Sequence, residues 1–162
     1  MIKKSTKDAN TGTRDESPHT FIRCGITPAY ITELNPNEIF VFGSNLRGLH
    51  GGGAARVARK LFGAIMGQGV GLQGQSYAIP TMQGGVDTIK PYVDEFIVFA
   101  KAHADLRFMV TRIGCGIAGF RDEDIAPLFQ EATSLANVSL PKEFIDILVK
   151  SREEREMRGK SR

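Results

Sequence analysis

The stretch that decides the fold runs Ile39-Phe40-Val41-Phe42-Gly43-Ser44-Asn45 and resumes after residue 50 as Gly51-Gly52-Gly53-Ala54-Ala55-Arg56-Val57-Ala58. Its first part is an uninterrupted apolar run, which is typical of a strand covered on both faces. Its second part opens on three glycines and continues with apolar residues at helical spacing. A glycine backbone at a helix N-terminus binds anions, because no Cβ blocks the approach and the helix dipole favours negative charge. We therefore predict a phosphate site at residues 51–53.

A second glycine-rich segment follows another apolar run, 108–113, and reads Gly114-Cys115-Gly116-Ile117-Ala118-Gly119-Phe120. Successive backbone N–H groups in such a segment can wrap a diphosphate. Ligands of open α/β sheets bind beyond the carboxyl ends of the strands, so we expect both glycine segments to open into one crevice. Two phosphate-sized segments in one crevice favour a diphosphate-bridged ligand, such as a dinucleotide or ADP-ribose.

The rest of the chain predicts alternating strands and helices. The expected strands are 21–24, 39–42, 77–80, 108–113 and 138–140. The first expected helical segment is a helix or turn that starts at Thr27-Pro28, with Ile31 and Leu34 pointing inward. Further helices are expected at 54–62, from near Thr88, and after an N-cap at Asp124. A short last helix is expected to bury Phe144, Ile147 and Leu148. This alternation predicts an α/β fold with three α/β/α layers and a mixed, mostly parallel sheet.

Length, charge and cysteine content limit the classes of protein. The 162 residues suit one domain, and we expect a disordered polar segment at 1–19, the domain at 20–149 and a basic polar tail at 150–162. The net charge is +3, and the tail alone supplies it, with six basic and three acidic residues. A neutral body argues against a broad nucleic-acid groove. Without a signal-like apolar stretch, and with two cysteines expected as reduced thiols, the chain is predicted to be cytoplasmic and without a membrane partner.

Several side chains of the two glycine segments are candidates for ligand contact. The predicted ligand-binding residues are Ser44, Asn45, Gly51, Gly52, Gly53, Gly114, Cys115, Gly116, Ile117, Ala118, Gly119 and Phe120. Asn45 offers an amide to a ribose hydroxyl, and it equally suits a turn. Phe120 fits stacking on a base or packing in the core. The sequence shows no histidine paired with Cys115 that would make it a nucleophile, and Arg112 is either a phosphate counter-charge or a plain strand residue.

Two further features leave alternatives open. The glycine-rich stretch 67–74 is a lid or wall of the pocket, or else a mobile surface loop. His50 is a proton-transfer group, or else a solvent-exposed loop histidine. No cluster of His, Cys and Asp has metal-ligand spacing, so we predict no bound metal and no cofactor beyond the nucleotide ligand itself.

These residues resemble the macro domain family of ADP-ribose binders over roughly residues 21–148. Asn45 followed by 51–53 is similar to the asparagine and glycine run of that family, and 114–120 is similar to its Ser/Thr-Gly-aliphatic-x-Gly-aromatic phosphate loop. The resemblance implies a cleft for ADP-ribose, in which the glycine segments hold the diphosphate and Asn45 positions the distal ribose. The family's Gly-Asp-Ile-Thr motif reads Cys24-Gly25-Ile26-Thr27 here, without the aspartate that reads adenine.

Three functions remain open from the sequence. The first is binding of ADP-ribose or a related NAD-derived nucleotide with hydrolysis of ADP-ribosyl linkages, for which Asn45 is the catalytic candidate. The second is a non-enzymatic nucleotide sensor or sequestering protein, which the lack of a clear general base favours. The third is a Rossmann-like nucleotide phosphoribohydrolase, against which counts the absence of any carboxylate between Asn45 and Val86. The expected partner is a small nucleotide or an ADP-ribosylated substrate, not a nucleic acid.

Overall fold

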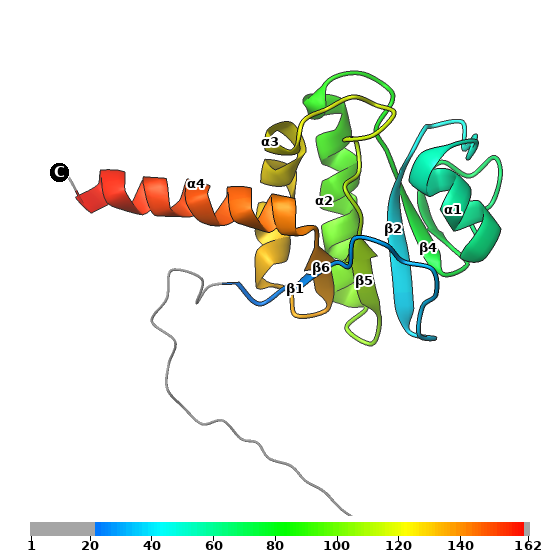
Figure 1. The fold of residues 1–162 in the computed structure, drawn as a ribbon, viewed down its shortest axis with the longest axis horizontal. Coiled ribbons are helices and arrows are strands. Elements are labelled where there is room, and N and C mark those ends of the chain that lie inside the picture. Colours follow the sequence, from blue (N-terminus) through cyan, green and yellow to red (C-terminus); the bar gives the residue numbers. More distant parts are fainter. Residues whose placement is uncertain (1–21, 161–162) are drawn as a thin grey trace, which may run out of the picture.

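The computed structural model describes residues 22–160 and folds them around one six-stranded sheet (Figure 1). The predicted disordered segment 1–19 lies outside the described residues. The strand order is β1-β6-β5-β2-β4-β3, and every neighbouring pair is parallel except β3 with β4. The strands are β1 (Gly25–Ile26), β2 (Glu38–Ser44), β3 (Gly71–Gln73), β4 (Ser76–Pro80), β5 (Arg107–Val110) and β6 (Val138–Leu140). The predicted mixed, mostly parallel sheet is confirmed.

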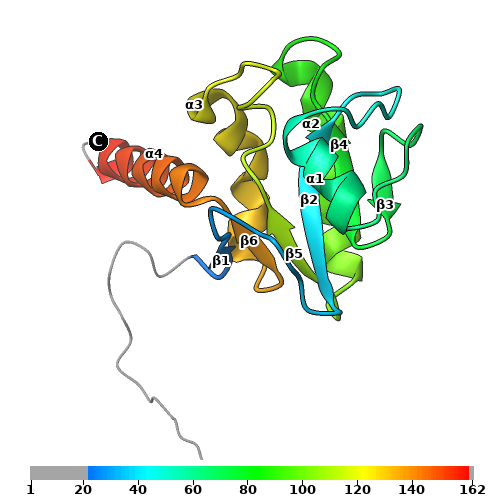
Figure 2. The same cartoon turned by 45° about the vertical axis from the view of Figure 1, so that its right-hand side comes forward.

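Helices cover both faces of this sheet. They are α1 (Gly53–Leu61), α2 (Val86–Ala102), α3 (Asp122–Ile125), the 3₁₀ helix η1 (Ala126–Ser134) and α4 (Lys142–Lys160). Successive side chains of a strand point to opposite faces, and in β2 they enter two separate cores. Phe40 and Phe42 pack with α1, whereas Ile39 and Val41 pack with α2, η1 and α4. The three-layer arrangement is therefore confirmed, with α1 and α2 on opposite sides of the sheet (Figure 2).

The first strand lies later in the chain than predicted. β1 is Gly25–Ile26, where Gly25 pairs with Ser139 of β6. A Cβ at Gly25 would lie 2.7 Å from Ser139 Oγ, so glycine lets the two strands approach. Within the described chain, no helix begins at Thr27-Pro28, because residues 27–35 are irregular. Ile31 and Leu34 still pack against the α1 core, as predicted.

Several other boundaries differ from the prediction. The strand predicted at 108–113 is β5, which ends at Val110 because 111–113 already lead into the turn that follows. α2 begins at Val86, two residues before the expected start. The stretch 67–74 is not all loop, since it contains the edge strand β3. Asp124 is the third residue of α3 and not its N-cap; its carboxylate accepts a hydrogen bond from the backbone N–H of Arg121 at 3.0 Å.

The last helix is longer than predicted. α4 continues through most of the 150–162 tail, so the predicted boundary at 149 falls inside a helix. Phe144 and Leu148 anchor its first half in the core, and its second half projects from the body of the protein (Figure 1). No helix among residues 22–160 has the length and apolar character that crossing a membrane requires.

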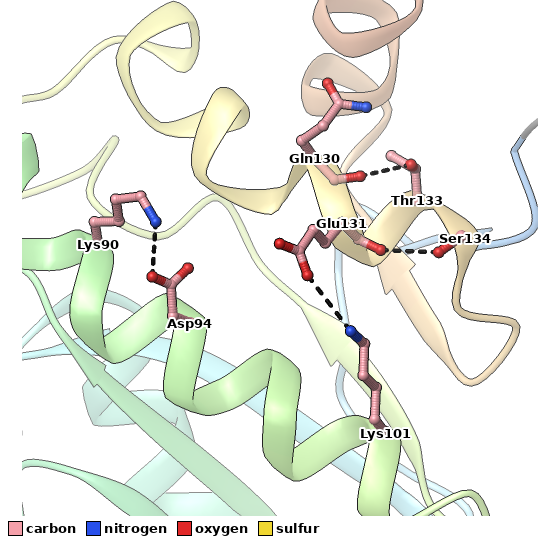
Figure 3. A network of polar contacts seen from close by, with 7 residues as sticks. All are labelled: Lys90, Asp94, Lys101, Gln130, Glu131, Thr133 and Ser134. Atoms are coloured by element: carbon pink, nitrogen blue, oxygen red, sulfur yellow. Dashed lines mark hydrogen bonds and ion pairs between the residues drawn. The ribbon is translucent and has the colours of Figure 1, made fainter.

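An exposed ion pair joins α2 to η1 on the face away from α1 (Figure 3). Lys101 Nζ lies 3.4 Å from Glu131 Oε2. The hydroxyls of Thr133 and Ser134 donate to the carbonyls of Gln130 and Glu131 and thereby satisfy backbone acceptors of η1. Exposed pairs of this kind contribute at most about 1 kcal/mol, so Lys101 can lose its charge at little cost to stability.

Candidate functional site

The two glycine segments meet across one cavity at the carboxyl end of β2. We call it the glycine cavity; its volume is about 160 Å³. Its lining comprises Gly43, Ser44, Asn45, Leu49, Gly52, Gly53, Ala54, Ala55, Thr81, Met82, Thr111, Arg112, Ile113, Gly114, Gly116, Ile117 and Ala118. Ile117 Cδ1 of the second segment lies 3.1 Å from the position of a Cβ at Gly52 of the first. The predicted convergence of the two segments is confirmed.

Four of the predicted ligand-binding residues are not part of this lining: Gly51, Cys115, Gly119 and Phe120. Cys115 and Phe120 are partly buried and pack against the larger core. The backbone N–H of Phe120 donates to the carbonyl of Gly114 at 2.8 Å, which closes the second glycine segment on itself. Phe120 therefore packs as a core residue, one of the two roles that the sequence left open.

The side chain of Asn45 closes the turn that leads from β2 to α1. Its Nδ2 donates to the carbonyl of Leu49 at 2.9 Å, and its Oδ1 accepts from the backbone N–H of Leu49 at 2.9 Å. Asn45 is half-buried and lines the glycine cavity. Its amide thus fixes the shape of the turn and stands in the lining of the glycine cavity.

The glycine-rich stretch 67–74 supports this turn from behind. Ser44 Oγ donates to the carbonyl of Gly69 at 2.6 Å, and the backbone N–H of Gly67 donates to the carbonyl of Gly48 at 2.9 Å. A Cβ at Gly69 would lie only 2.3 Å from the carbonyl oxygen of Asn45, so the two backbones are in direct contact. No residue of 67–74 lines the glycine cavity. The stretch packs beneath the turn and lies outside the cavity lining, so the expectation of a cavity wall was wrong, whereas the lid and the mobile loop stay predictions.

His50 is fully buried, which contradicts the expected solvent-exposed histidine. Its Nε2 lies 3.1 Å from the carbonyl of Gln68 and 3.2 Å from Oε1 of Gln73. Gln73 Oε1 also accepts from the backbone N–H of Ile65. Since both partners of Nε2 are acceptors, Nε2 carries the hydrogen, and Nδ1 has no hydrogen-bond partner. His50 does not line the glycine cavity, so it ties the supporting stretch to the first glycine segment instead of serving a ligand.

Arg112 is the only charged residue in the lining of the glycine cavity. Its Nε and Nη2 donate to Oδ1 and Oδ2 of Asp122 at 3.0 and 2.9 Å. Hydrogen bonding to Asp122 raises the pKa of Arg112 above its ordinary value. Burial, assisted by the neighbouring Asp122, raises the pKa of the Cys115 thiol to about 12. Cys115 is therefore a neutral thiol at pH 7, which agrees with the lack of a base beside it.

A second cavity adjoins the first and shares Thr111 and Arg112 with it. We call it the larger cavity; its volume is about 620 Å³. Its lining comprises Ile26, Thr27, Pro28, Ala29, Tyr30, Val110, Thr111, Arg112, Pro141, Lys142 and Glu143. Thr27 is 7% exposed, and its hydroxyl has no hydrogen-bond partner. A buried polar atom left unpaired costs free energy, so such an atom beside a cavity points to a missing partner.

Parts of both linings were not predicted from the sequence. Leu49, Thr81 and Met82 reach the glycine cavity from turns that carry no local motif. Thr27, in contrast, belongs to the stretch 24–27 that the resemblance had aligned with a family motif. Thr111 could have been found from its position directly before Arg112.

Comparison of the chain with protein-family models, with curated proteins and with solved structures gives no match. The resemblance to macro domains thus stays a prediction. Within residues 22–160, no three side chains of His, Cys, Asp and Glu are grouped so that they could hold a metal ion.

Proposed function

We propose that the chain binds ADP-ribose or a related NAD-derived nucleotide across the two cavities. The observation that carries this proposal is the convergence of the glycine segments 51–53 and 114–119 on one small cavity. The N-terminus of α1, whose N-cap Gly52 makes no side-chain capping hydrogen bond, begins at this cavity, and a helix N-terminus favours an anion. Its volume of about 160 Å³ suits a diphosphate with part of a sugar better than a whole nucleotide.

The larger cavity then takes the nucleoside end of the ligand. It adjoins the glycine cavity through Thr111 and Arg112, so one bridged molecule can occupy both. The unpaired hydroxyl of Thr27 offers this end a hydrogen bond. A ligand with its diphosphate in the middle and a sugar on each side matches this order of compartments.

The chemistry of the glycine cavity favours binding over turnover. Its lining holds no carboxylate, histidine, lysine or cysteine, so none of its residues acts as a general base at neutral pH. Both polar atoms of the Asn45 amide are already engaged with Leu49. A sensor or sequestering protein is therefore our primary proposal, and hydrolysis with Asn45 orienting the ribose is the second candidate.

Binding is tested by isothermal titration calorimetry with ADP-ribose, AMP, NAD and adenosine. Gly52 has extended backbone angles that any residue adopts, but a side chain there meets Ile117 and enters the cavity. Gly52→Val should weaken ADP-ribose binding at least about tenfold, because it covers the amide groups that face the phosphates. Gly51→Val is the matched comparison, since a Cβ at Gly51 meets no atom within 4 Å and the residue lies outside the lining.

The result also separates the competing functions. Tighter binding of AMP than of ADP-ribose would favour a phosphoribohydrolase, and no binding of any nucleotide would refute the proposal. Turnover is tested by release of ADP-ribose from an ADP-ribosylated protein. Turnover that Asn45→Ala abolishes, with ADP-ribose binding retained, would replace the sensor proposal by the hydrolase. Because that variant also opens the turn at 45–49, its melting temperature is measured beside its activity.

A further inference from the structure

We infer that Arg112, oriented by Asp122, is the residue that makes this site select phosphorylated nucleotides over bare nucleosides. The inference rests on the proposed function, because it names the group that recognises the phosphate of the proposed ligand. It takes up one of the two roles that the sequence left open for Arg112, the phosphate counter-charge, and adds that Asp122 orients the guanidinium.

Asp122 holds the Arg112 guanidinium in place through two of its nitrogens, and the guanidinium can still donate to a second anion. The guanidinium meets Asp122 side-on, with Nε–Oδ1 and Nη2–Oδ2 distances of 3.0 and 2.9 Å. Asp122 begins α3 and its side chain is only 18% exposed, whereas the Arg112 side chain is 51% exposed. A guanidinium has five N–H donors, so the donors not bonded to Asp122 remain for a ligand. A planar fork of this kind matches the spacing of phosphate oxygens.

The position of Arg112 is at the junction of the two cavities, since it lines both of them. In the proposed ligand this junction is where the diphosphate meets the nucleoside. The other groups facing the glycine cavity are neutral, and they offer dipoles without net charge. Without Arg112, no side chain of that lining would balance the charge of a diphosphate.

The remaining cation near the site does not serve this purpose. Lys142 lines the larger cavity, but its side chain is 70% exposed and its Nζ is paired with Asp146 one helical turn later at 2.6 Å. It does not line the glycine cavity. Arg112 is therefore the cation that a phosphate at the junction would meet.

The test compares the affinities for ADP-ribose and adenosine in the full chain and in three variants. Arg112→Gln should weaken ADP-ribose binding about tenfold, because a charge-assisted hydrogen bond at a half-exposed site is lost. Its affinity for adenosine should change less than about twofold, because adenosine carries no phosphate. Arg112→Lys should recover part of the loss, since it keeps the charge without the fork. Lys101→Gln, which removes a half-exposed cation that is also paired with a carboxylate but stands near the end of α2, should leave both affinities unchanged.

Two further readouts separate recognition from stability. The ADP-ribose affinity of the unaltered protein should fall as salt concentration rises, and this dependence should be weaker in Arg112→Gln. Melting temperatures identify any variant that has lost its fold, in which case Arg112→Lys carries the comparison. Equal losses for ADP-ribose and adenosine, or no loss for either, would overturn the role of Arg112 while leaving the proposed function in place. Failure of the unaltered protein to bind ADP-ribose, ADP or pyrophosphate would overturn both.

Discussion

Gly69→Ala should destabilise the whole protein although residue 69 touches neither cavity. Gly69 lies in the stretch that supports the turn after β2, and its backbone angle is outside the left-handed region, so alanine is not strained by conformation there. The added methyl would instead lie 2.3 Å from the carbonyl oxygen of Asn45 and 2.6 Å from that of Leu46. Both neighbours are backbone atoms and cannot turn aside as a flexible side chain would.

The size of the effect follows from these distances. To reach even 3.0 Å from the Asn45 oxygen, the two backbones must separate by 0.7 Å. Such overpacking costs about 1–3 kcal/mol. The separation also strains two bonds between the segments, from Ser44 Oγ to Gly69 and from Gly67 to Gly48, each contributing about 1 kcal/mol. We expect a total loss of about 3 kcal/mol, which for a domain of this size lowers the melting temperature by about 6–12 °C.

The assay is thermal unfolding followed by circular dichroism, with urea unfolding at 25 °C as a second measurement of the free energy. Gly51→Ala is the matched control, since the same methyl there meets nothing within 4 Å, and it should change the melting temperature by less than about 2 °C. A Gly69→Ala protein as stable as the Gly51→Ala protein would show that the supporting stretch moves freely. The contact between the two backbones would then not hold the turn, and our account of residues 67–74 would be wrong.

Three other variants or treatments test separate parts of the structure. Ile117→Ala should lower ADP-ribose affinity severalfold without changing the melting temperature, because residue 117 is 73% exposed and its side chain lies beside Gly52 and Gly53 at the cavity; an unchanged affinity would remove it from the site. His50→Ala should cost about 2 kcal/mol of stability in urea unfolding, through the lost bond to Gln68 and the space left in the core, and a smaller cost than Gly51→Ala would contradict its structural role. The Cys115 pKa of about 12 predicts slow alkylation of the folded protein, with a rate that still rises above pH 9. Because the pKa is higher in the folded state, the stability that the neutral thiol contributes is complete below pH 9 and is lost as pH rises toward 12. A labelling rate that levels off near pH 9 in the folded protein would refute this.

Much of the fold could be predicted because its signals are local. The apolar run 39–42 became the central strand β2, and the helical spacing at 54–62 became α1 with a shift of one residue. Strand–helix alternation was enough for the three layers, since a mostly parallel sheet needs cover on both faces. The errors fell where local signals were weak or misleading. At 27–35, a Thr-Pro start and two inward apolar residues resembled a helix, but the segment packs as irregular chain against α1.

The candidate site was likewise predictable in part. Glycine runs after apolar strands are visible in the sequence, and the rule that strand ends meet at one edge brought both runs to one cavity. For Arg112 the sequence left open a phosphate counter-charge or a plain strand residue, because its pairing with Asp122 at 3.0 Å depends on the fold of the second glycine segment. The unpaired hydroxyl of Thr27 could not be predicted from the sequence either, because its burial depends on the fold that brings Thr27 and the start of α4 to one cavity.

Most of the strands and helices, and the two glycine-rich segments where no side chain blocks an anion, could be inferred from the residues alone. These properties depend on side-chain periodicity and on the absence of a Cβ, both of which are local. The folded chain was needed to show that 67–74 supports a turn, that His50 is buried and that Arg112 lines two cavities. Each of these depends on contacts between residues ten or more positions apart, whose geometry is set by the strand order and not by any neighbour in the chain.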